Sequence, residues 1–365
     1  MKFEVKYKLQ SGSLSRFADF GETRQVGWKS PSNIALIKYW GKKDFQIPIN
    51  PSISFSLENS YTKTTISYSP TKDEPLLNFK FEGDENKAFE KRIFEVINRF
   101  KIYMPFLNSL NLDIESKNSF PHSSGIASSA SSMSALALNI CTIEKDLFGT
   151  LQNESEFFQK ASFLSRLASG SAARSVYSGY VCWGKTPTLE NSSDEVAVPI
   201  SGHIDEKFNN LYDAILITSS REKNVSSSKG HRLMQEHPYA EARKNQVKSH
   251  LNDIITSFQF GDDSIFVKVV ENEALSLHAL MMSSQPGYNL LNDNTWNIIE
   301  RIRTFRTLTG INVSFTLDAG PNVHLIYSER NKNEVKNFIA VELQQFCENG
   351  FWIDDKMGKG PEKTI

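Results

Sequence analysis

The stretch 120–139, FPHSSGIASSASSMSALALN, places a run of glycine and serine directly before a segment with helical periodicity. Gly125 permits φ > 0 or a close backbone approach, and the small side chains around it leave peptide N–H groups uncovered. Downstream, the spacing of Met133, Leu136 and Ile140 predicts one buried helix face. The loop N–H groups and the positive end of the helix would then point the same way, which favours an anion cradle. A serine-rich loop before an ordinary helix has the same pattern.

A predicted strand leads into this loop. Leu110, Leu112 and Ile114 alternate with polar residues, as in a half-buried strand. The order strand, glycine-serine loop, helix is therefore present. The loop is not of the Walker type, because no Gly-Lys-Ser/Thr follows at the required offset and there is no GxGxxG.

Helix and strand patterns continue along the chain and predict a mixed α/β protein. Helices are expected at 86–103, 154–167, 239–258, 264–282, 294–307 and 334–346. Strands are expected at 54–68, 77–81, 179–183, 214–217, 311–317 and 323–327. The polar stretch 186–195 is the expected boundary between an N-terminal domain, residues 1–195, and a C-terminal domain, residues 196–365.

The two ends of the chain carry weaker patterns. Residues 1–27 contain two weak strand signals, and we expect them to form an extension packed on the first domain. The tail from Lys356, KMGKGPEKTI, is expected to be mobile.

Composition argues against several classes of protein. The 365 residues, 39% of them hydrophobic, can bury two adjoining cores. The net charge of −1 and the lack of a Lys/Arg-rich run argue against nucleic-acid binding. The three cysteines are isolated, which argues against disulfides and structural zinc and suits a reducing compartment. No apolar run approaches the roughly 18 residues that span a bilayer, so we expect a cytoplasmic protein that does not enter a membrane.

The segment 30–42, SPSNIALIKYWGK, predicts a short apolar strand that ends in two lysines and an aromatic pair. Lys38 follows directly on the apolar run, and an unpaired buried ammonium is costly, so a partner is expected if the side chain is buried. Lys38 and Lys42 could equally be two solvated lysines at the end of a strand.

Three further segments carry polar groups in suggestive places. Arg174 follows several tiny residues, a setting that suits bidentate capture of a carboxylate or phosphate, although a surface arginine after a helix gives the same pattern. The loop 219–230 is dense in hydroxyl and cationic groups and is either a second anion contact or a solvated loop. The turn 318–322, DAGPN, consists of turn-forming residues, so it is either purely structural, which its composition favours, or part of a site.

Together these segments resemble one family, the mevalonate diphosphate decarboxylases of the GHMP kinase superfamily. Five motifs occur in the family's order: NIALIKYWGK at 33–42, FPHSSGIASSAS at 120–131, SGSAARS at 169–175, VSSSKG at 225–230 and LDAGPN at 317–322. Phosphate loops occur across the superfamily, whereas KYWGK together with DAGPN is specific to the decarboxylase branch.

This resemblance implies a fold and a reaction. The fold would be two α/β domains, an N-terminal one like ribosomal protein S5 and a ferredoxin-like C-terminal one, with the active site in the cleft between them. ATP would phosphorylate the 3-hydroxyl of 5-diphosphomevalonate, and loss of phosphate and CO2 would give isopentenyl diphosphate. The expected cofactors are ATP and Mg²⁺, and family habit suggests a homodimer.

The resemblance also implies residue roles at the reacting end of the substrate. Asp318 matches the catalytic aspartate that orients the 3-hydroxyl and takes its proton. Lys38 matches the lysine that pairs with it and keeps it ionised. Arg174 matches the arginine that holds the substrate carboxylate, with Asn33 as its orienting partner.

Two larger sets of residues match binding positions. The substrate's diphosphate is expected at Tyr39, Lys42, Ser169, Ser171, Ser227 and Ser228. ATP is expected at Ser123, Ser124, Gly125, Ala127, Ser128 and Ser129. Among these, Ser128 and Ser129 are also expected near Mg²⁺, together with the ATP phosphates.

The chain departs from the family pattern at three places. His122, Ser123 and Ser124 replace a threonine and two alanines of the phosphate loop, Ala173 replaces a cysteine, and Ser228 stands where some members have an arginine. Two alternatives therefore remain: a relative that acts on mevalonate or its 5-phosphate, as a 3-kinase or a decarboxylase, and a degenerate member that binds nucleotide as a regulator or scaffold. The degenerate member should have lost one of the matched residues, and none is lost.

Overall fold

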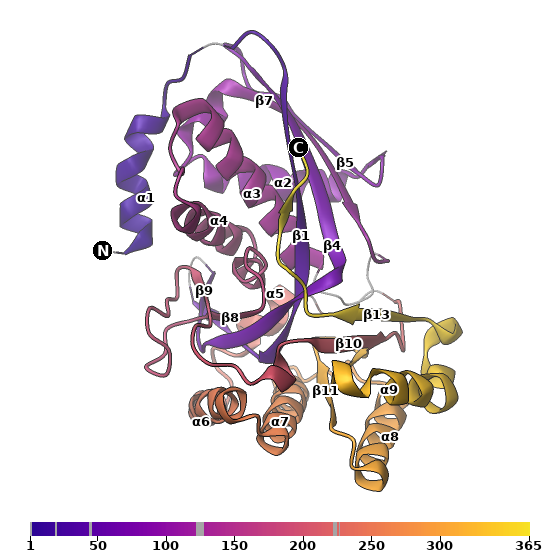
Figure 1. The fold of residues 1–365 in the computed structure, drawn as a ribbon. Coiled ribbons are helices and arrows are strands. Elements are labelled where there is room, and N and C mark those ends of the chain that lie inside the picture. Colours follow the sequence, from indigo (N-terminus) through magenta and orange to yellow (C-terminus); the bar gives the residue numbers. More distant parts are fainter. Residues whose placement is uncertain (1, 19, 44–45, 122–127, 222–224, 226) are drawn as a thin grey trace.

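The protein folds into two mixed α/β domains, each built on its own sheet (Figure 1). We describe a computed structural model, which covers residues 2–18, 20–43, 46–121, 128–221, 225 and 227–365, without the side chains of 227 and 228. The expected strand at 54–68 and the expected helices up to residue 307 are all present, with bounds that shift by a few residues.

The first domain contains a large mixed sheet. Its main strands run in the order β14-β1-β4-β7-β5-β6, and β8 and β9 continue it from β4. The strands are β1 (Arg24–Ile37), β4 (Ser52–Pro70), β5 (Leu77–Phe81), β6 (Asp84–Glu85), β7 (Leu110–Asn118), β8 (Tyr180–Trp183), β9 (Ala197–Pro199) and β14 (Glu362–Lys363). Only the β5–β7 pair is parallel among the pairs of this sheet that the structure describes. A separate ribbon joins β2 (Lys42–Lys43) to β3 (Ile47–Pro48).

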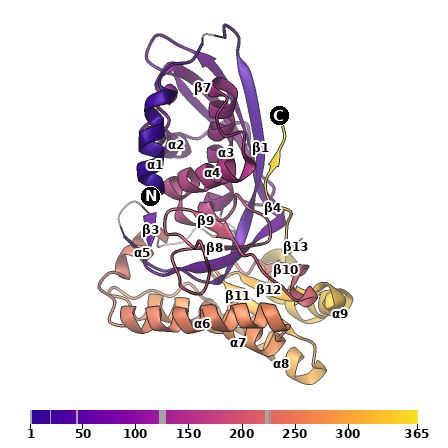
Figure 2. The same ribbon diagram turned by 60° about the vertical axis from the view of Figure 1, so that its left-hand side comes forward.

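Helices cover one face of this sheet, as the two views in Figures 1 and 2 show. They are α2 (Lys87–Phe100), α3 (Ser128–Phe148) and α4 (Glu154–Ala168), and α1 (Phe3–Ser11) lies outside them, against α4. The central helix, α3, is buried over most of its length because its residues are small or apolar on every side. The predicted strand before the glycine-serine segment and the predicted helix after it are confirmed, and residues 122–127 between them lie outside the described residues.

The second domain has a four-stranded antiparallel sheet in the order β11-β12-β10-β13. Its strands are β10 (Leu211–Leu216), β11 (Val313–Leu317), β12 (Val323–Ser328) and β13 (Trp352–Lys356). Its helices are α5 (Ser227–Leu233), α6 (Ala240–Phe260), α7 (Asp263–Met282), α8 (Asp293–Thr309) and α9 (Lys332–Phe338). The expected last helix, 334–346, is α-helical only to Phe338 and continues as a π-helical turn (Ile339–Leu343) and a 3-10 turn (Gln344–Phe346).

Side-chain caps account for where several helices begin. In each case an Asn or Asp oxygen accepts a hydrogen bond from a backbone N–H of the first turn, which satisfies a donor that has no partner within the helix. The caps are Asn86 for α2, Asn153 for α4, Asp262 for α7 and Asn292 for α8. Gly261 and Gly310, with φ of 67° and 70°, end α6 and α8.

The N-terminal extension packs on the first domain, as expected, and its last residues, from Arg24, enter strand β1, but the strand signal at the beginning of the chain was wrong. Residues 3–11 form helix α1, in which Tyr7 is fully buried and its ring centroid lies 4.9 Å from that of Phe163. The carboxylate of Glu195 accepts hydrogen bonds from the backbone N–H groups of Phe3 and Glu4, at 2.7 and 3.4 Å. The first turn of α1 is therefore capped by a residue far away in the sequence.

The expectation of a mobile tail was also wrong. After β13 the chain returns to the first domain, where β14 pairs with β1 at Trp28 and Lys29. Gly27 lies opposite the last residues, and a Cβ at this position would come within 2.7 Å of Thr364 Oγ1. The tail therefore occupies the outer edge of the large sheet, as the yellow end of the ribbon in Figure 1 shows.

Candidate active site

The two domains contribute one residue each to a central ion pair. Lys38 follows the last residue of β1, and Asp318 follows the last residue of β11. The Nζ atom of Lys38 lies 2.9 Å from Oδ1 of Asp318. The Lys38 side chain is only 2% exposed, whereas that of Asp318 is 27% exposed. The buried member thus has its partner, and part of the Asp318 side chain is exposed to solvent.

The surroundings of the pair set its charge. Burial is the main cause that lowers the pKa of Lys38, and Asp318 and Glu273 oppose it by stabilising the ammonium. On the other side, Nε2 of His278 donates a hydrogen bond to the backbone carbonyl of Asp318 at 3.0 Å. A hydrogen bond therefore links the turn that carries Asp318 to α7.

A buried arginine lies on the N-terminal side of the same site. Arg174 follows the 3-10 turn η4 (Gly170–Ala173), and its Nε and Nη2 atoms donate to Oδ1 of Asn33 at 3.2 and 3.0 Å. A further hydrogen bond runs from Nη1 to Oγ of Ser52. Asn33 is itself held, because its Nδ2 donates to Oγ of Ser175 at 2.8 Å. The guanidinium is thus fixed in orientation before any ligand arrives.

An aromatic cluster lies next to Arg174. The Tyr39 ring stacks on His231, with 4.8 Å between centroids, and meets the edge of Trp183 at 4.9 Å. The Arg174 guanidinium carbon is 5.7 Å from the centroid of the Tyr39 ring, and Nζ of Lys42 is 5.9 Å away. Two cationic groups therefore flank one half-buried phenol ring.

Lys42 has an unusual pKa for a lysine. Burial, with a smaller effect from the charge of Arg92, lowers its pKa to about 8. For Tyr39, burial raises the pKa to about 12. Lys42 is consequently cationic at neutral pH but loses its charge within a range of pH that enzymes tolerate.

The structure brings part of the predicted phosphate site to this cluster. Ser128 and Ser129 open α3, and Oγ of Ser129 lies 3.4 Å from Oγ of Ser169. Ser171 belongs to η4, and its carbonyl accepts from Asn33 Nδ2 at 3.3 Å.

Other predicted residues cannot be placed. Ser123, Ser124, Gly125 and Ala127 lie outside the described residues. Ser227 and Ser228 begin α5, but their side chains lie outside what the structure describes.

A cavity of about 80 Å³ opens beside Ser128 and Ser129. Its wall is mostly apolar and comes from β5, β7, α2 and the first turns of α3. The residues on it include Phe79, Phe81, Phe89, Arg92, Ile114 and Met133. A flat apolar group attached to phosphates at α3 would find a wall of matching chemistry here.

Comparison with known proteins supports the same assignment over both domains. Residues 30–197 match the model of the diphosphomevalonate decarboxylase-like N-terminal domain, and residues 214–360 match that of the mevalonate 5-diphosphate decarboxylase C-terminal domain. The diphosphomevalonate decarboxylase of Debaryomyces hansenii is 30% identical over 327 residues, which are 85% of this chain and 81% of that protein. The chain belongs to the diphosphomevalonate decarboxylase family.

Other members of the family agree in sequence and in fold. The diphosphomevalonate decarboxylase of Candida albicans is 31% identical over 85% of this chain and 86% of its own length. The crystal structure of mevalonate diphosphate decarboxylase from Staphylococcus aureus superposes with a TM-score of 0.81 at 26% identity, covering 95% of this chain and 100% of that one. The structure of MDDEF in complex with MVAPP, AMPPCP and magnesium gives a TM-score of 0.79 at 26% identity, covering 94% and 99%.

The fit to Mg²⁺ rests on hydroxyl groups and on the nucleotide. Across the described ranges, no group of three or more His, Cys, Asp or Glu side chains is arranged to hold a metal ion. Ser128 and Ser129 offer neutral hydroxyls at a helix N-terminus, which suit a metal that arrives already bound to phosphates.

None of the helices that the structure describes is long and apolar enough to cross a membrane.

Sequence reasoning missed His231, which immediately follows the VSSSKG motif. Its ring stacks on Tyr39 and lies 4.5 Å from the ring of Trp40, centroid to centroid, and its Nδ1 accepts a hydrogen bond from the Gly41 N–H at 3.0 Å. Burial keeps the pKa of His231 well below its usual value, so the ring is neutral and can accept. Its position next to a family motif was the available signal.

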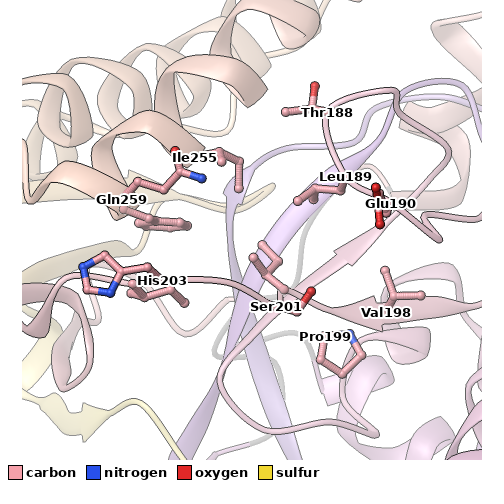
Figure 3. Close-up of a pocket in the computed structure, with 12 residues that line it drawn as sticks. Thr188, Leu189, Glu190, Val198, Pro199, Ser201, His203, Ile255 and Gln259 are labelled. Carbon is pink, nitrogen blue, oxygen red and sulfur yellow. The ribbon is translucent and has the colours of Figure 1, made fainter.

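A second cavity, of about 270 Å³, lies elsewhere in the molecule (Figure 3). Residues of the 186–195 segment, of β9 and the segment after it, and of the C-terminal half of α6 form its wall, and Leu189, His203 and Gln259 are among them. None of Lys38, Arg174 or Asp318 lines it.

Proposed function

We propose that this member of the family decarboxylates (R)-5-diphosphomevalonate in an ATP-dependent reaction that releases ADP, phosphate, CO2 and isopentenyl diphosphate. The observation that carries the proposal is the Lys38–Asp318 pair, 2.9 Å apart, with an accessible carboxylate and a fixed arginine in the same site. This arrangement provides a proton acceptor for a hydroxyl and a clamp for a carboxylate, and the substrate carries its hydroxyl on C3 and its carboxylate on the neighbouring C2.

Asp318 orients the 3-hydroxyl and accepts its proton as the γ-phosphoryl group is transferred to the 3-oxygen. Phosphoryl transfer depends mostly on positioning, so a carboxylate in contact with the nucleophile suffices. The ammonium of Lys38 keeps Asp318 ionised by direct charge pairing.

Decarboxylation follows from the loss of the new 3-phosphate. The C3–O bond breaks and phosphate leaves with the electron pair, so positive charge develops at C3. The electron pair of the bond between C2 and the carboxylate carbon then forms the C2=C3 double bond, and CO2 leaves. Arg174 positions the carboxylate, but too tight a clamp would stabilise it against this loss, so the charge at C3 drives the step.

We assign the substrate's diphosphate to the cluster around Tyr39, with Lys42, Ser169 and Ser171 as its N-terminal contacts and Ser227 and Ser228 closing over it on α5. The triphosphate of ATP lies at the glycine-serine loop, from Ser123 to Ser129. The cavity lined by Phe79 and Phe89 is the place we assign to the adenine, because it is apolar and adjoins Ser128. Mg²⁺ neutralises phosphate charge when it is bound with the nucleotide, near Ser128 and Ser129.

The proposal also covers the domain boundary, the cellular location and the oligomeric state. The expected division between residues 195 and 196 would separate β9 (Ala197–Pro199) from its partner β8, so we place the division a few residues later, between β9 and β10; the matched family domains, which end at 197 and begin at 214, support a division in this region. We also propose that the protein is a cytoplasmic homodimer.

The test offers mevalonate, its 5-phosphate and its 5-diphosphate separately to the purified protein with ATP and Mg²⁺, and follows ADP and CO2. We expect equal amounts of ADP and CO2 from the diphosphate alone. ADP without CO2, or turnover of the monophosphate or of mevalonate instead, would refute the proposal and assign the chain to another activity of the superfamily.

A further inference from the structure

The main chain of Lys38 is held by an ion pair from the second domain. Its backbone N–H donates to Oε2 of Glu273 at 2.8 Å, and its carbonyl accepts from Nη2 of Arg243 at 2.7 Å. Arg243 and Glu273 also bind each other through two parallel hydrogen bonds, of 2.7 and 2.6 Å. They belong to α6 and α7, which lie side by side and pack against β1 (Figure 2).

These groups are fully withdrawn from water. The Glu273 side chain is 0% exposed and that of Arg243 is 2% exposed. His250 donates a further hydrogen bond to Oε1 of Glu273 at 2.6 Å, so each carboxylate oxygen accepts two hydrogen bonds. Although burial opposes ionisation, the charge of Arg243 and the hydrogen bonds lower the pKa of Glu273 to about 2.

Stability alone is a poor explanation for such a pair. Removing two charges from water costs about as much as their attraction returns, and apolar side chains of similar volume often stabilise a protein equally well. What an apolar pair could not do is bind both peptide groups of one particular residue. The ion pair makes these two bonds to Lys38, whose side chain contacts Asp318.

We propose that Glu273 and Arg243 are positioning residues that fix the backbone of Lys38 and so aim its ammonium at Asp318. The inference rests on the proposed role of Lys38 in the transfer to the 3-hydroxyl. Asn50 completes the arrangement, since its Nδ2 donates to the Lys38 carbonyl at 3.0 Å. Residues of both domains therefore hydrogen-bond to the backbone at the end of β1.

Glu273 also contributes charge at Lys38. The charged groups that act on the Lys38 ammonium are Asp318 and Glu273, which favour it, and Arg174, which disfavours it, while Arg243 binds the carbonyl of the same residue. Removing the charge of Glu273 should therefore lower the pKa of Lys38 further. The alkaline limb of the pH–rate profile should move to lower pH, a change that mere loosening of the fold would not cause.

The decisive comparison uses two variants on the same helix. Glu273→Gln removes the charge behind Lys38. Glu271→Gln is the matched control, because Glu271 is also buried in an ion pair on α7, with Arg306 at 2.6 Å, but does not touch Lys38. We expect Glu273→Gln to lower kcat about 10- to 100-fold with both KM values within threefold, and Glu271→Gln to keep kcat within twofold. Equal effects of the two variants, or an unmoved alkaline limb, would overturn the inference.

A second variant covers the case in which Glu273→Gln does not fold. The double change Arg243→Met/Glu273→Leu removes both charges together, so neither is left buried and alone. We expect a folded protein with kcat still reduced at least tenfold, and a crystal structure in which Lys38 Nζ no longer lies within hydrogen-bond distance of Asp318. Wild-type kcat, or an unchanged Lys38–Asp318 contact, would overturn the inference.

The same assays separate this inference from the proposed function. ADP release reports phosphoryl transfer whether or not CO2 follows. Wild-type protein that forms ADP without CO2 would refute the decarboxylase proposal while the Glu273 comparison still stands on ADP. The crystal structure of the double variant tests the contact without any turnover.

Discussion

At the scale of single residues, the two members of the central ion pair differ in exposure. The side chain of Lys38 is buried, whereas that of Asp318 is exposed enough to contact a substrate hydroxyl. This asymmetry assigns proton acceptance to the aspartate and charge support to the lysine.

Asp318→Asn tests this division directly. The amide keeps the shape of the side chain but accepts no proton, so we expect kcat to fall about 10³-fold or more, in the upper range for loss of a general base. Calorimetry should give Kd values for ATP and the diphosphate substrate within a few-fold of the wild type. A variant that retained more than a tenth of wild-type turnover would remove Asp318 from the catalytic role.

Lys42 gives the site a dependence on pH. Its pKa is lowered to about 8, chiefly by burial, so the side chain is cationic below pH 8 and neutral above it. If it binds the diphosphate as an ammonium, the KM for that substrate should rise up to about tenfold between pH 7 and pH 9, in proportion to the lost charged fraction. The KM for ATP serves as the internal control.

The variant Lys42→Gln completes this experiment. Its KM for the diphosphate should already be raised at pH 7 and should stay level up to pH 9. A wild-type KM that does not change over this range would contradict the assignment of Lys42.

At the scale of elements, helix α5 packs through the ring of His231 on the segment that follows β1. His231 lies against Tyr39 and Trp40, and Gly230 leaves no room for a side chain, because a Cβ would come within 2.6 Å of Trp40. Helix α5 is thereby held next to the segment between β1 and β2, which Lys38 begins and after which Lys42 follows.

We expect His231→Ala to raise the KM for the diphosphate about tenfold, because α5 loses both its ring contacts and its acceptor for the Gly41 N–H. The KM for ATP should change less than threefold. His203→Ala provides the control, since His203 is exposed and lies at the second cavity. The same KM in both variants would show that α5 does not depend on this contact.

The returning tail is a second element with a measurable role. β14 covers the edge of β1 through the ladder at Trp28 and Lys29 and the bond from Thr364 N–H to the Gly27 carbonyl at 2.8 Å. Deleting 361–365 removes a few exposed hydrogen bonds of about 1 kcal/mol each. We expect Tm to fall by about 2–5 °C and kcat to stay within twofold.

Gly27→Ala is the companion variant, because its Cβ would collide with Thr364. If both changes act on the same contact, their effects on Tm should not add. Fully additive effects, or a deletion without any effect on Tm, would contradict a structural role for the tail.

Sequence patterns predicted the helices and strands whose apolar residues recur with the period of the element. They missed the elements that are stabilised by residues far away in the sequence. Strand β7 and helix α3 follow their apolar spacing, and the need of Lys38 for a partner was visible in the strand that precedes it. In α1, Phe3, Val5, Tyr7 and Leu9 alternate as in a strand, yet only Tyr7 is buried, and the helix depends on Glu195.

Two other features had no local signal. Both residues of β14 are exposed, so no apolar alternation marks the strand. Arg243 and Glu273 lie in two different helices, where isolated charges are usually solvated. Only the packing of α6 and α7 against β1 brings these charges together at Lys38.

At the scale of the whole molecule, the site exists only where the two sheets meet. Lys38 follows a strand of the first sheet and Asp318 a strand of the second, and Thr316 of β11 donates to the Ala35 carbonyl of β1 at 3.4 Å. A ligand that contacts both domains therefore binds only the folded arrangement, and its free energy of binding adds to the free energy of unfolding.

This linkage gives a last prediction, which concerns the metal. Because the described residues offer no cluster of His, Cys, Asp and Glu for a metal ion, Mg²⁺ should bind through the nucleotide. We expect 1 mM Mg²⁺ alone to leave Tm within about 1 °C. Mg²⁺ with ATP at about 100 times its Kd should add about 2.7 kcal/mol and raise Tm by several degrees.

Thermal unfolding with EDTA, with Mg²⁺, with ATP and with both gives the four values that this comparison needs. Activity should disappear in EDTA and return when Mg²⁺ is restored, because the phosphates need their charge neutralised for transfer. A rise in Tm with Mg²⁺ in the absence of nucleotide would contradict entry with ATP and would point to a metal site made by the protein itself.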